Sequence, residues 1–167
     1  MRIGELLALT YKDFDFDKNI IHIIKTCTRL FQKDIIGPPK TPKSTRDVTM
    51  PLFLAETVKV YIQSLHAFEP SIRLFEITKY SLYKEMKRVS FRSGVKEIRL
   101  HDLRHSHASY LIHRGIPIIA ISQRLGHEKI ETTLRTYAHL YPQDRDIIID
   151  AIESDPEIKG SIKGHGQ

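Results

Sequence analysis

Hydrophobic residues recur with two different periods in this chain, and the period changes near residue 51. Before that point, short β-branched and aromatic runs are separated by glycine and proline, which is typical of strands joined by turns. The strand-like runs are residues 19–25, 27–33 and 46–50. After that point, apolar residues recur at helical spacing. The helical segments are residues 53–67, 79–93, 102–114, 117–125, 130–141 and 142–153. The pattern predicts a mostly helical α+β domain with a small three-stranded antiparallel sheet.

Smaller features complete the predicted element order. The good helix formers of residues 4–14 predict a short opening helix. Residues 72–75 predict one further extended piece. Gly115 and Gly126 each follow a helical segment, and glycine commonly ends helices, so we expect both to be helix stops.

The composition agrees with one folded domain. The chain has 167 residues, of which 41% are hydrophobic and 28% are charged, close to the globular average. We expect a domain over residues 1–154 and a disordered tail over 155–167, where glycines are frequent and apolar residues few. No apolar run approaches the roughly 18 residues of a membrane span. A single cysteine, Cys27, leaves no internal disulfide, so we expect a cytoplasmic protein without membrane contact.

The net charge of +6 is concentrated in one segment. Residues 25–46 contain six basic side chains and one acid, so this segment carries +5 of the total. Such a patch attracts phosphates, as nucleic-acid-binding segments do. Solvated lysines that protect the edges of a hairpin explain the charge equally well, so charge alone leaves both interpretations open.

Six of the nine histidines lie between His101 and His139. His101 and His105 are four residues apart and would share a helix face, as in some zinc sites. However, no acidic residue completes a helix-borne metal motif, and Arg104 adds a cation to that face, so we expect neither a metal nor a cofactor. His107 is expected to be a partly buried, hydrogen-bonded residue. His101 and Arg104, three apart at a helix start, can act together on one anion.

Four stretches, in this order, resemble the motifs of the tyrosine recombinases, the phage integrase family. The first two lie in the N-terminal third of the chain. Residues 1–9, MRIGELLAL, resemble the box that holds the first catalytic arginine, which is Arg2 here. Residues 39–48, PKTPKSTRDV, resemble the β-hairpin that holds the catalytic lysine. The resemblance assigns that lysine to Lys40, with Lys43 as the alternative.

The other two matching stretches lie in the helical part. His101-Asp-Leu-Arg104 matches the His-x-x-Arg box at both positions. Further on, His127 and Tyr137 match the last histidine and the nucleophilic tyrosine, separated as in the family. Tyr141 is the alternative nucleophile. One such match would be weak evidence for the family, whereas four matches in the family's order are specific to it.

The resemblance implies an enzyme that cuts and rejoins DNA through a covalent 3′-phosphotyrosyl link. A phenol with a pKa near 10 attacks a phosphodiester only where cations stabilise the charge that develops. The expected catalytic cations and donors are Arg2, Arg104, His101 and His127. Lys40 is expected to protonate the departing 5′-oxygen. The bond energy stays in the ester, so the resemblance implies neither metal nor ATP.

The implied role is site-specific recombination, the integration or excision of a prophage or other mobile element. The implied partners are duplex DNA and further copies of the chain in a tetrameric synapse. The expected DNA contacts outside the catalytic set are Arg29, Lys33, Lys43 and Arg46. Family members carry a core-binding domain ahead of the arginine box, which we expect this chain to lack. The alternative is a DNA-binding module without cleavage, and the retained tyrosine beside basic residues speaks against it.

Overall fold

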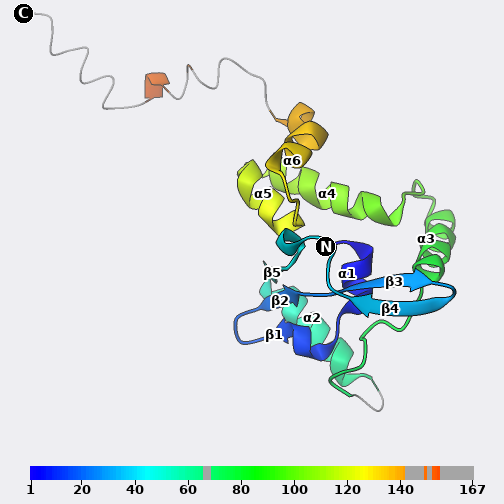
Figure 1. Ribbon diagram of the computed structural model, residues 1–167. Helices are drawn as coiled ribbons and strands as arrows, with labels where there is room; N and C mark the ends of the chain where they lie inside the picture. The colour runs from blue at the N-terminus through cyan, green and yellow to red at the C-terminus, as the bar shows by residue number, and fades with distance from the viewer. Residues whose placement is uncertain (66–68, 142–148, 150–151, 155–167) are drawn as a thin grey trace, which may run out of the picture.

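The computed structural model describes residues 1–65, 69–141, 149 and 152–154, and for Lys43 the backbone alone. A β-rich part and a helical part meet at the N-terminal helix α1 (Ile3–Ala8), which lies between them (Figure 1). Over the described ranges, no helix combines the length and the apolar character that a membrane crossing requires.

The β-rich part contains a three-stranded antiparallel sheet in the order β1-β2-β5. Its strands are β1 (Phe14–Asp15), β2 (Ile20–Ile23) and β5 (Arg46–Thr49). Ile21 lies opposite Val48 in the register, and alternate residues of β2 face inward. Helix α2 (Leu52–Gln63) adds Ala55 to this core. The buried members of the core are Leu9, Ile21, Ile23, Val48, Met50 and Ala55.

The predicted three-stranded antiparallel sheet is confirmed, but one of its predicted strands was wrong. The run 27–33 does not join it. Instead β3 (Thr26–Leu30) pairs with β4 (Lys33–Gly37) in a separate hairpin. The turn at Phe31 and Gln32, whose φ angles are 46° and 62°, reverses the chain and brings β4 alongside β3. In the three-stranded sheet β2 is central, with β1 and β5 on its two sides, so β5 takes the place beside β2 that was expected for β3.

The opening helix is shorter than predicted, because α1 ends at Ala8. Leu9 is extended, and a separate 3-10 turn, η1, follows (Tyr11–Asp13). The Asp13 carboxylate accepts hydrogen bonds from the Thr10 backbone nitrogen at 2.7 Å and from its hydroxyl at 2.8 Å, which favours this turn over a continued helix. The extended piece predicted at 72–75 is confirmed as one antiparallel bridge between Thr10 and Arg73.

The helical part confirms the predicted helices to within a few residues. They are α3 (Lys79–Ser93), α4 (Leu100–His113), α5 (Ile118–Leu125) and α6 (Ile130–Tyr137), followed by the 3-10 turn η3 (Ala138–Leu140). Helices α4, α5 and α6 enclose a second core. Its buried residues are Ala108, Ile112, Ile121, Leu125 and Tyr137. Most of the helix predicted at 142–153, and the tail predicted at 155–167, lie outside the described residues.

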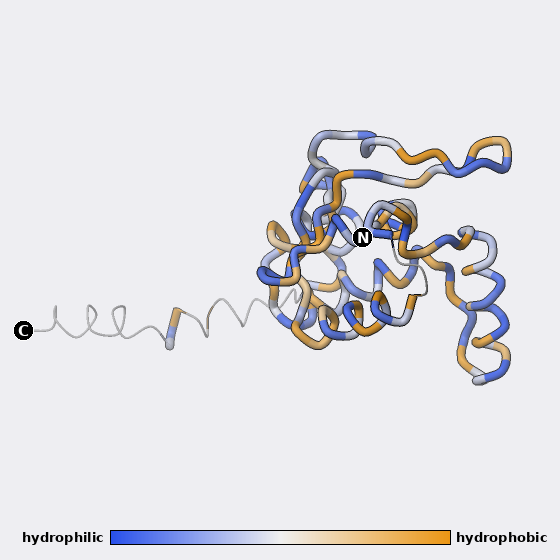
Figure 2. The backbone as a smooth tube through the Cα atoms, turned by 90° about the horizontal axis from the view of Figure 1, so that it is seen from below, coloured by the Kyte–Doolittle hydropathy of each residue, from blue (hydrophilic) through white to orange (hydrophobic). Residues whose placement is uncertain are grey.

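Two elements extend from the domain on the same side. Figures 1 and 2 both show the β3–β4 hairpin and helix α3 reaching beyond the rest of the fold. Helix α3 has no buried residue, and Phe31 at the hairpin tip is 90% exposed. These two elements therefore offer surface to a partner more than they contribute to either core.

Candidate active site

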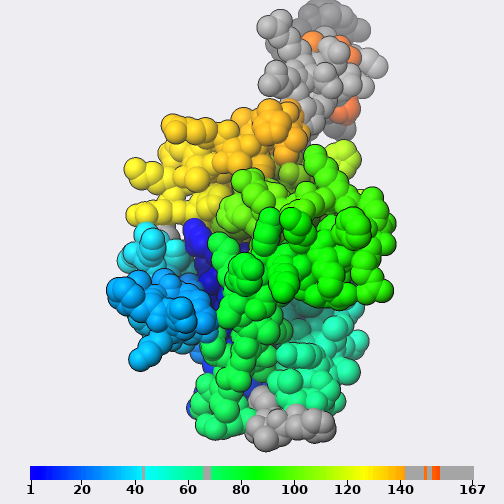
Figure 3. All heavy atoms as spheres, turned by 90° about the vertical axis from the view of Figure 1, so that its right-hand side faces the viewer, coloured from blue at the N-terminus to red at the C-terminus, as the bar shows by residue number. Residues whose placement is uncertain are grey.

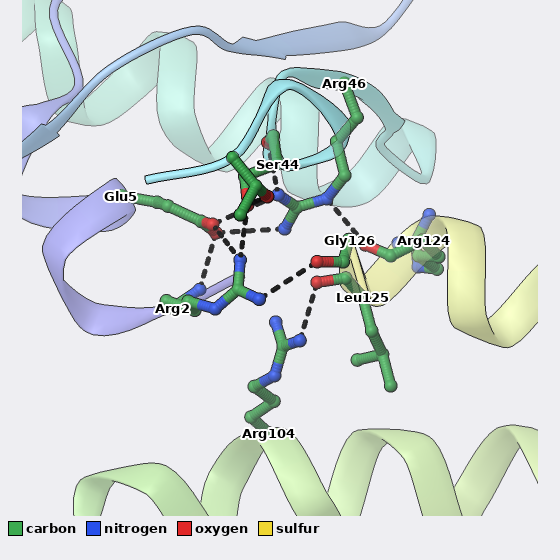
Figure 4. A network of polar contacts seen from close by, with 9 residues as sticks. Arg2, Glu5, Ser44, Arg46, Arg104, Arg124, Leu125 and Gly126 are labelled. Atoms are coloured by element: carbon green, nitrogen blue, oxygen red, sulfur yellow. Dashed lines mark hydrogen bonds and ion pairs between the residues drawn. The ribbon is translucent and has the colours of Figure 1, made fainter. Parts of the chain in front are cut away.

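Arg2 and Glu5 form an ion pair at the start of α1 (Figure 4). The buried Glu5 carboxylate accepts hydrogen bonds from the Arg2 backbone nitrogen at 2.6 Å and from its Nη1 at 2.9 Å. Arg46 of β5 donates to the same carboxylate from Nη1 at 3.1 Å and from Nη2 at 2.9 Å. Burial by itself raises the pKa of Glu5, but the hydrogen bonds from Arg46 and Arg2 hold that pKa below its usual value. Glu5 is thus a charged carboxylate between two arginines.

Three arginine side chains converge on the C-terminal end of α5 (Figure 4). Arg46 Nε donates to Arg124 O at 3.0 Å, Arg104 Nη2 to Leu125 O at 2.5 Å, and Arg2 Nη2 to Gly126 O at 2.9 Å. The last carbonyl groups of a helix lack partners within the helix and carry its partial negative charge, so they suit cations. These bonds bring three segments that are far apart in the sequence to one point.

Arg104 has one donor left over. Its side chain is almost completely buried, and within the part of the chain that the structure describes its Nη1 has no hydrogen-bond partner. Burial, and next the charge of Arg2, lower the pKa of Arg104 to about 10, so the guanidinium is still charged at neutral pH. A buried charged donor without a partner is costly, and an anionic oxygen would satisfy it. The site is therefore suited to bind a phosphate.

His127 lies directly after Gly126, whose positive φ of 68° ends helix α5 as predicted. Its Nδ1 is 2.8 Å from the Thr133 hydroxyl. Burial, followed by the charges of Arg104 and Arg2, lowers the pKa of His127 to about 4, so the ring is neutral at pH 7. With Nδ1 engaged by Thr133, Nε2 is the nitrogen available to a ligand.

His101 lies in the first turn of α4 and meets His105 edge to face, with ring centroids 4.8 Å apart. Desolvation, and then the nearby His105 and Arg104, lower the pKa of His101. Among the described residues, no three His, Cys, Asp or Glu side chains gather as a metal site would require. His107, on the same helix, is partly buried and accepts a hydrogen bond from Arg124 Nε at 3.1 Å, as expected.

Tyr137 ends α6 and is only 3% exposed. Its ring is part of the second core, and its hydroxyl lies 2.6 Å from Nδ1 of His105. Burial raises the pKa of the phenol, while the charge of Arg104 acts in the opposite direction. The structure therefore brings the predicted nucleophile within electrostatic reach of the buried arginine. The alternative, Tyr141, also packs on this core.

The predicted lysine lies outside this cluster. Lys40 is exposed in the loop between β4 and the 3-10 turn η2 (Pro42–Ser44), and no described residue bonds to its side chain. It was expected on a β-hairpin, but β4 and β5 belong to different sheets, so its loop connects two sheets. The side chain of Lys43 is not described.

The remaining predicted DNA contacts divide into two groups. Lys33 is exposed on the hairpin, and Arg29, also exposed there, pairs with Asp34 at 3.1 Å. Arg46 differs, because its side chain is buried and bonded to Glu5 and to the end of α5. In the folded protein the guanidinium of Arg46 bonds Glu5, and its contact with DNA stays a prediction.

A cleft of about 1370 Å³ opens beside the cluster. It is lined by α1, the β3–β4 hairpin and the first turns of α3 and α4, and both His101 and Arg104 reach it. Figure 3 shows the first residues of the chain recessed between the hairpin and α3. Two of the predicted phosphate-binding residues, His101 and Arg104, thus line a groove whose wall includes Arg29.

The sequence pattern did not indicate Glu5, nor the contacts that Arg46 and His105 make in this site. Glu5 and Arg46 are joined across 41 residues, a separation that no local pattern reveals. The spacing of His105 from His101 suggests only a metal ligand, although His105 directly follows Arg104 and so belongs to the helix of the His-x-x-Arg motif. The one usable signal for Glu5 was its position in the first turn of the opening helix, where a carboxylate can bond the free backbone nitrogens.

Known structures share this fold. The Tn1549 transposon integrase in complex with a circular intermediate DNA superimposes with a TM-score of 0.78 at 22% identity, covering 92% of this chain and 54% of that one. The catalytic domain of bacteriophage HP1 integrase gives a TM-score of 0.56 at 21% identity, covering all of this chain and 79% of that one. The fold is thus that of the catalytic domain of a tyrosine recombinase.

Sequence comparison leads to the family. The chain belongs to the phage integrase family, which it matches over residues 1–144. The ICEBs1 integrase of Bacillus subtilis (strain 168) is 34% identical over 166 residues, covering 92% of this chain and 45% of that protein. Transposase A from transposon Tn554 of Staphylococcus aureus is 30% identical, covering 86% of this chain and 41% of that protein. The chain spans less than half the length of these two relatives.

Proposed function

We propose that the chain is the catalytic part of a site-specific DNA recombinase that integrates or excises a mobile element. The observation that carries this proposal is the buried Nη1 of Arg104, a charged donor left without a protein partner beside Arg2 and within electrostatic reach of Tyr137. A module that only binds DNA has no need of a buried phenol at that place. The names of the relatives, which are integrases and a transposase, agree with this role.

In the proposed reaction, the Tyr137 oxygen attacks a phosphorus atom of the DNA backbone. A bond forms between that oxygen and phosphorus, the bond from phosphorus to the 5′-oxygen breaks, and the 3′-phosphate stays on the protein. Arg2 and Arg104 stabilise the negative charge on the phosphoryl oxygens, with His101 and His127 as further donors. The 5′-oxygen takes its proton from Lys40. Rejoining reverses each step, and the ester conserves the bond energy without a cofactor.

Duplex DNA is the proposed substrate, and the cleft between the hairpin and α3 is its proposed path. Arg29 and Lys33 lie on the hairpin, where they would reach phosphates outside the reacting one. Lys43 is a further expected contact. Exchange of strands between two duplexes needs one nucleophile per strand, so we expect four copies to assemble on DNA. Such a protein works where the chromosome is, in the cytoplasm.

The test is a trapping experiment. The protein is incubated with nicked duplexes made from the DNA that flanks its own gene, so that cleavage near the nick releases a short fragment and prevents rejoining. We expect a covalent protein–DNA adduct on a denaturing gel. Tyr137→Phe removes only the hydroxyl and should give no adduct while binding the same DNA.

Tyr141→Phe is the matched control, because it removes a neighbouring hydroxyl that also packs on the second core. It should form the adduct. If Tyr141→Phe forms no adduct and Tyr137→Phe does form it, the nucleophile is Tyr141. A wild-type protein that binds these duplexes and never forms an adduct would instead be the DNA-binding module without cleavage.

A further inference from the structure

The Tyr137 hydroxyl has one specific neighbour in the folded protein. The distance from Oη to Nδ1 of His105 is 2.6 Å, a short hydrogen bond that joins the end of α6 to the middle of α4. The two rings lie close, with centroids 5.7 Å apart and planes tilted by 56°. Because Tyr137 is packed into the second core, its hydroxyl approaches His105 in a fixed direction.

The phenol needs a proton acceptor at the moment of attack. At 3% exposure Tyr137 has little contact with bulk water, so solvent is poorly placed to remove the proton. Burial also raises the pKa of this phenol, so ionisation before the reaction is unfavourable. The neighbouring cations stabilise the charge on phosphate, but a guanidinium cannot accept a proton. An acceptor in contact with Oη is therefore required.

The other two histidines expected in the site, His101 and His127, are assigned as donors to the phosphate and make different contacts. The Nδ1 atom of His127 is bonded to Thr133, and the ring of His101 packs against His105 and not against the phenol. Lys40 is assigned to the opposite end of the reaction, where it supplies a proton. Of the histidines described in this site, His105 is the one that the structure places in hydrogen-bond contact with Tyr137.

We infer that His105 is the general base that takes the Tyr137 proton during cleavage and returns it during rejoining. This role rests on the proposed function. As the bond from Oη to phosphorus forms, the proton moves from Oη to the Nδ1 lone pair of His105. The electron pair of the breaking bond leaves with the 5′-oxygen, which is protonated by Lys40. In the reverse direction His105 gives its proton back to Oη.

The contact with His101 fits this role. When His105 holds the proton, its ring is a cation beside a second imidazole at 4.8 Å. Two charged rings at that separation would repel each other. Desolvation and the surrounding charges lower the pKa of His101, so at neutral pH its ring is uncharged and does not oppose the transfer. The edge-to-face contact also limits rotation of the His105 ring.

The test separates proton transfer from simple positioning. His105→Asn places an amide close to where Nδ1 lies, so it keeps a hydrogen bond to Oη but cannot hold a proton. His105→Ala removes both. We expect both variants to form the trapped adduct about 10²-fold to 10⁴-fold more slowly than wild type, the usual contribution of a general base, with unchanged DNA affinity. His113→Asn, on an exposed position of the same helix, should react at the wild-type rate.

A second arm changes the acidity of the phenol. Tyr137 is replaced by difluorotyrosine, whose phenol ionises more readily and depends less on a base, and the effect of His105→Asn is measured again. We expect its penalty to shrink by at least about tenfold, as the proton becomes easier to lose.

Three outcomes decide between the two proposals. A wild-type rate in His105→Asn, or a penalty unaltered by fluorination, would show that His105 only positions the ring. A wild-type protein that forms no adduct would overturn the proposed function itself, and the role of His105 with it.

Discussion

Arg46 occupies the space in which any side chain at position 126 would have to lie. A Cβ atom built on Gly126 would be 2.7 Å from Arg46 Nη1. This close approach lets Arg46 bond the Arg124 carbonyl while the Gly126 carbonyl accepts from Arg2. The φ of Gly126 is also positive, at 68°. Glycine is thus needed here both for the backbone and for the room that it leaves.

Gly126→Ala should lower both stability and activity. The left-handed backbone costs a residue with a Cβ atom about 1–2 kcal/mol in unfolding free energy, and displacement of Arg46 adds to this. Gly94→Ala is the matched control, because its φ is 70° and nothing lies within 4 Å of its Cβ position. Urea unfolding should show a larger loss for Gly126→Ala, and only this variant should slow adduct formation. Equal losses of stability with unchanged cleavage in both variants would contradict the role given to Arg46.

Glu5→Gln should destabilise the protein in a pH-dependent manner. It leaves Arg46 and Arg2 without their counter-charge, and removing one partner of a buried ion pair costs about 3 kcal/mol or more. The pKa of Glu5 is lower in the folded than in the unfolded chain, so its stabilising contribution is complete above about pH 4.5 and disappears as the pH falls toward the folded value. The unfolding free energy of wild type should therefore fall on acidification more steeply than that of Glu5→Gln.

Glu85→Gln is the control for that measurement. Glu85 forms an exposed ion pair with Arg88 on α3, and such pairs contribute little. The unfolding free energy of Glu85→Gln should change with pH as that of wild type does. If that of Glu5→Gln does so as well, the Glu5 network is not a source of acid sensitivity.

Arg104→Lys should separate catalysis from binding. Lysine keeps the charge but has a single ammonium group, which cannot occupy both Nη positions and so cannot bond Leu125 O and a phosphate in the same geometry. We expect adduct formation to slow by about 10² to 10³ while DNA affinity changes far less. Arg88→Lys, at an exposed position paired with Glu85, should leave the rate unchanged. A loss of affinity as large as the loss of rate would make Arg104 a DNA-positioning contact.

Substitutions in the turn of the β3–β4 hairpin should stabilise the folded protein. Phe31 and Gln32 both have positive φ, a conformation that suits Asn-Gly in a two-residue hairpin turn. Replacing them by Asn and Gly should raise the free energy of unfolding by about 1–2 kcal/mol in urea titrations. The double alanine variant keeps the unfavourable backbone angles and should show no gain. A gain in the alanine variant would attribute the effect to the exposed Phe31 ring and not to the turn.

Local signals explain most of what could be predicted from the sequence. His101 and Arg104 share one helix, and Gly126 and His127 share one helix end, so spacing alone brings each pair together. The strand β4 was missed because its pattern is short and its pairing depends on an unusual turn at Phe31.

Long-range polar contacts explain what could not be predicted. The ion pair between Arg46 and Glu5 left no local signal, because the two residues are 41 positions apart. The hydrogen bond from Tyr137 to His105 spans 32 residues and depends on how α4 and α6 pack. Periodicity identifies which face of a helix is buried, but it does not identify which polar atom a buried hydroxyl will meet.

A change in the leaving group of the DNA can identify the general acid from reaction rates alone. Lys40→Ala should slow cleavage of ordinary DNA by about 10²-fold to 10⁴-fold, since the 5′-oxygen then leaves without a proton. A substrate with sulfur in place of that bridging oxygen should restore the rate, because a thiolate leaves readily as an anion. Lys43→Ala, in the 3-10 turn η2 that follows this loop, is the matched control and should gain nothing from sulfur. Rescue of Lys43→Ala together with failure to rescue Lys40→Ala would make Lys43 the general acid, and the 3-10 turn before β5 would then carry it.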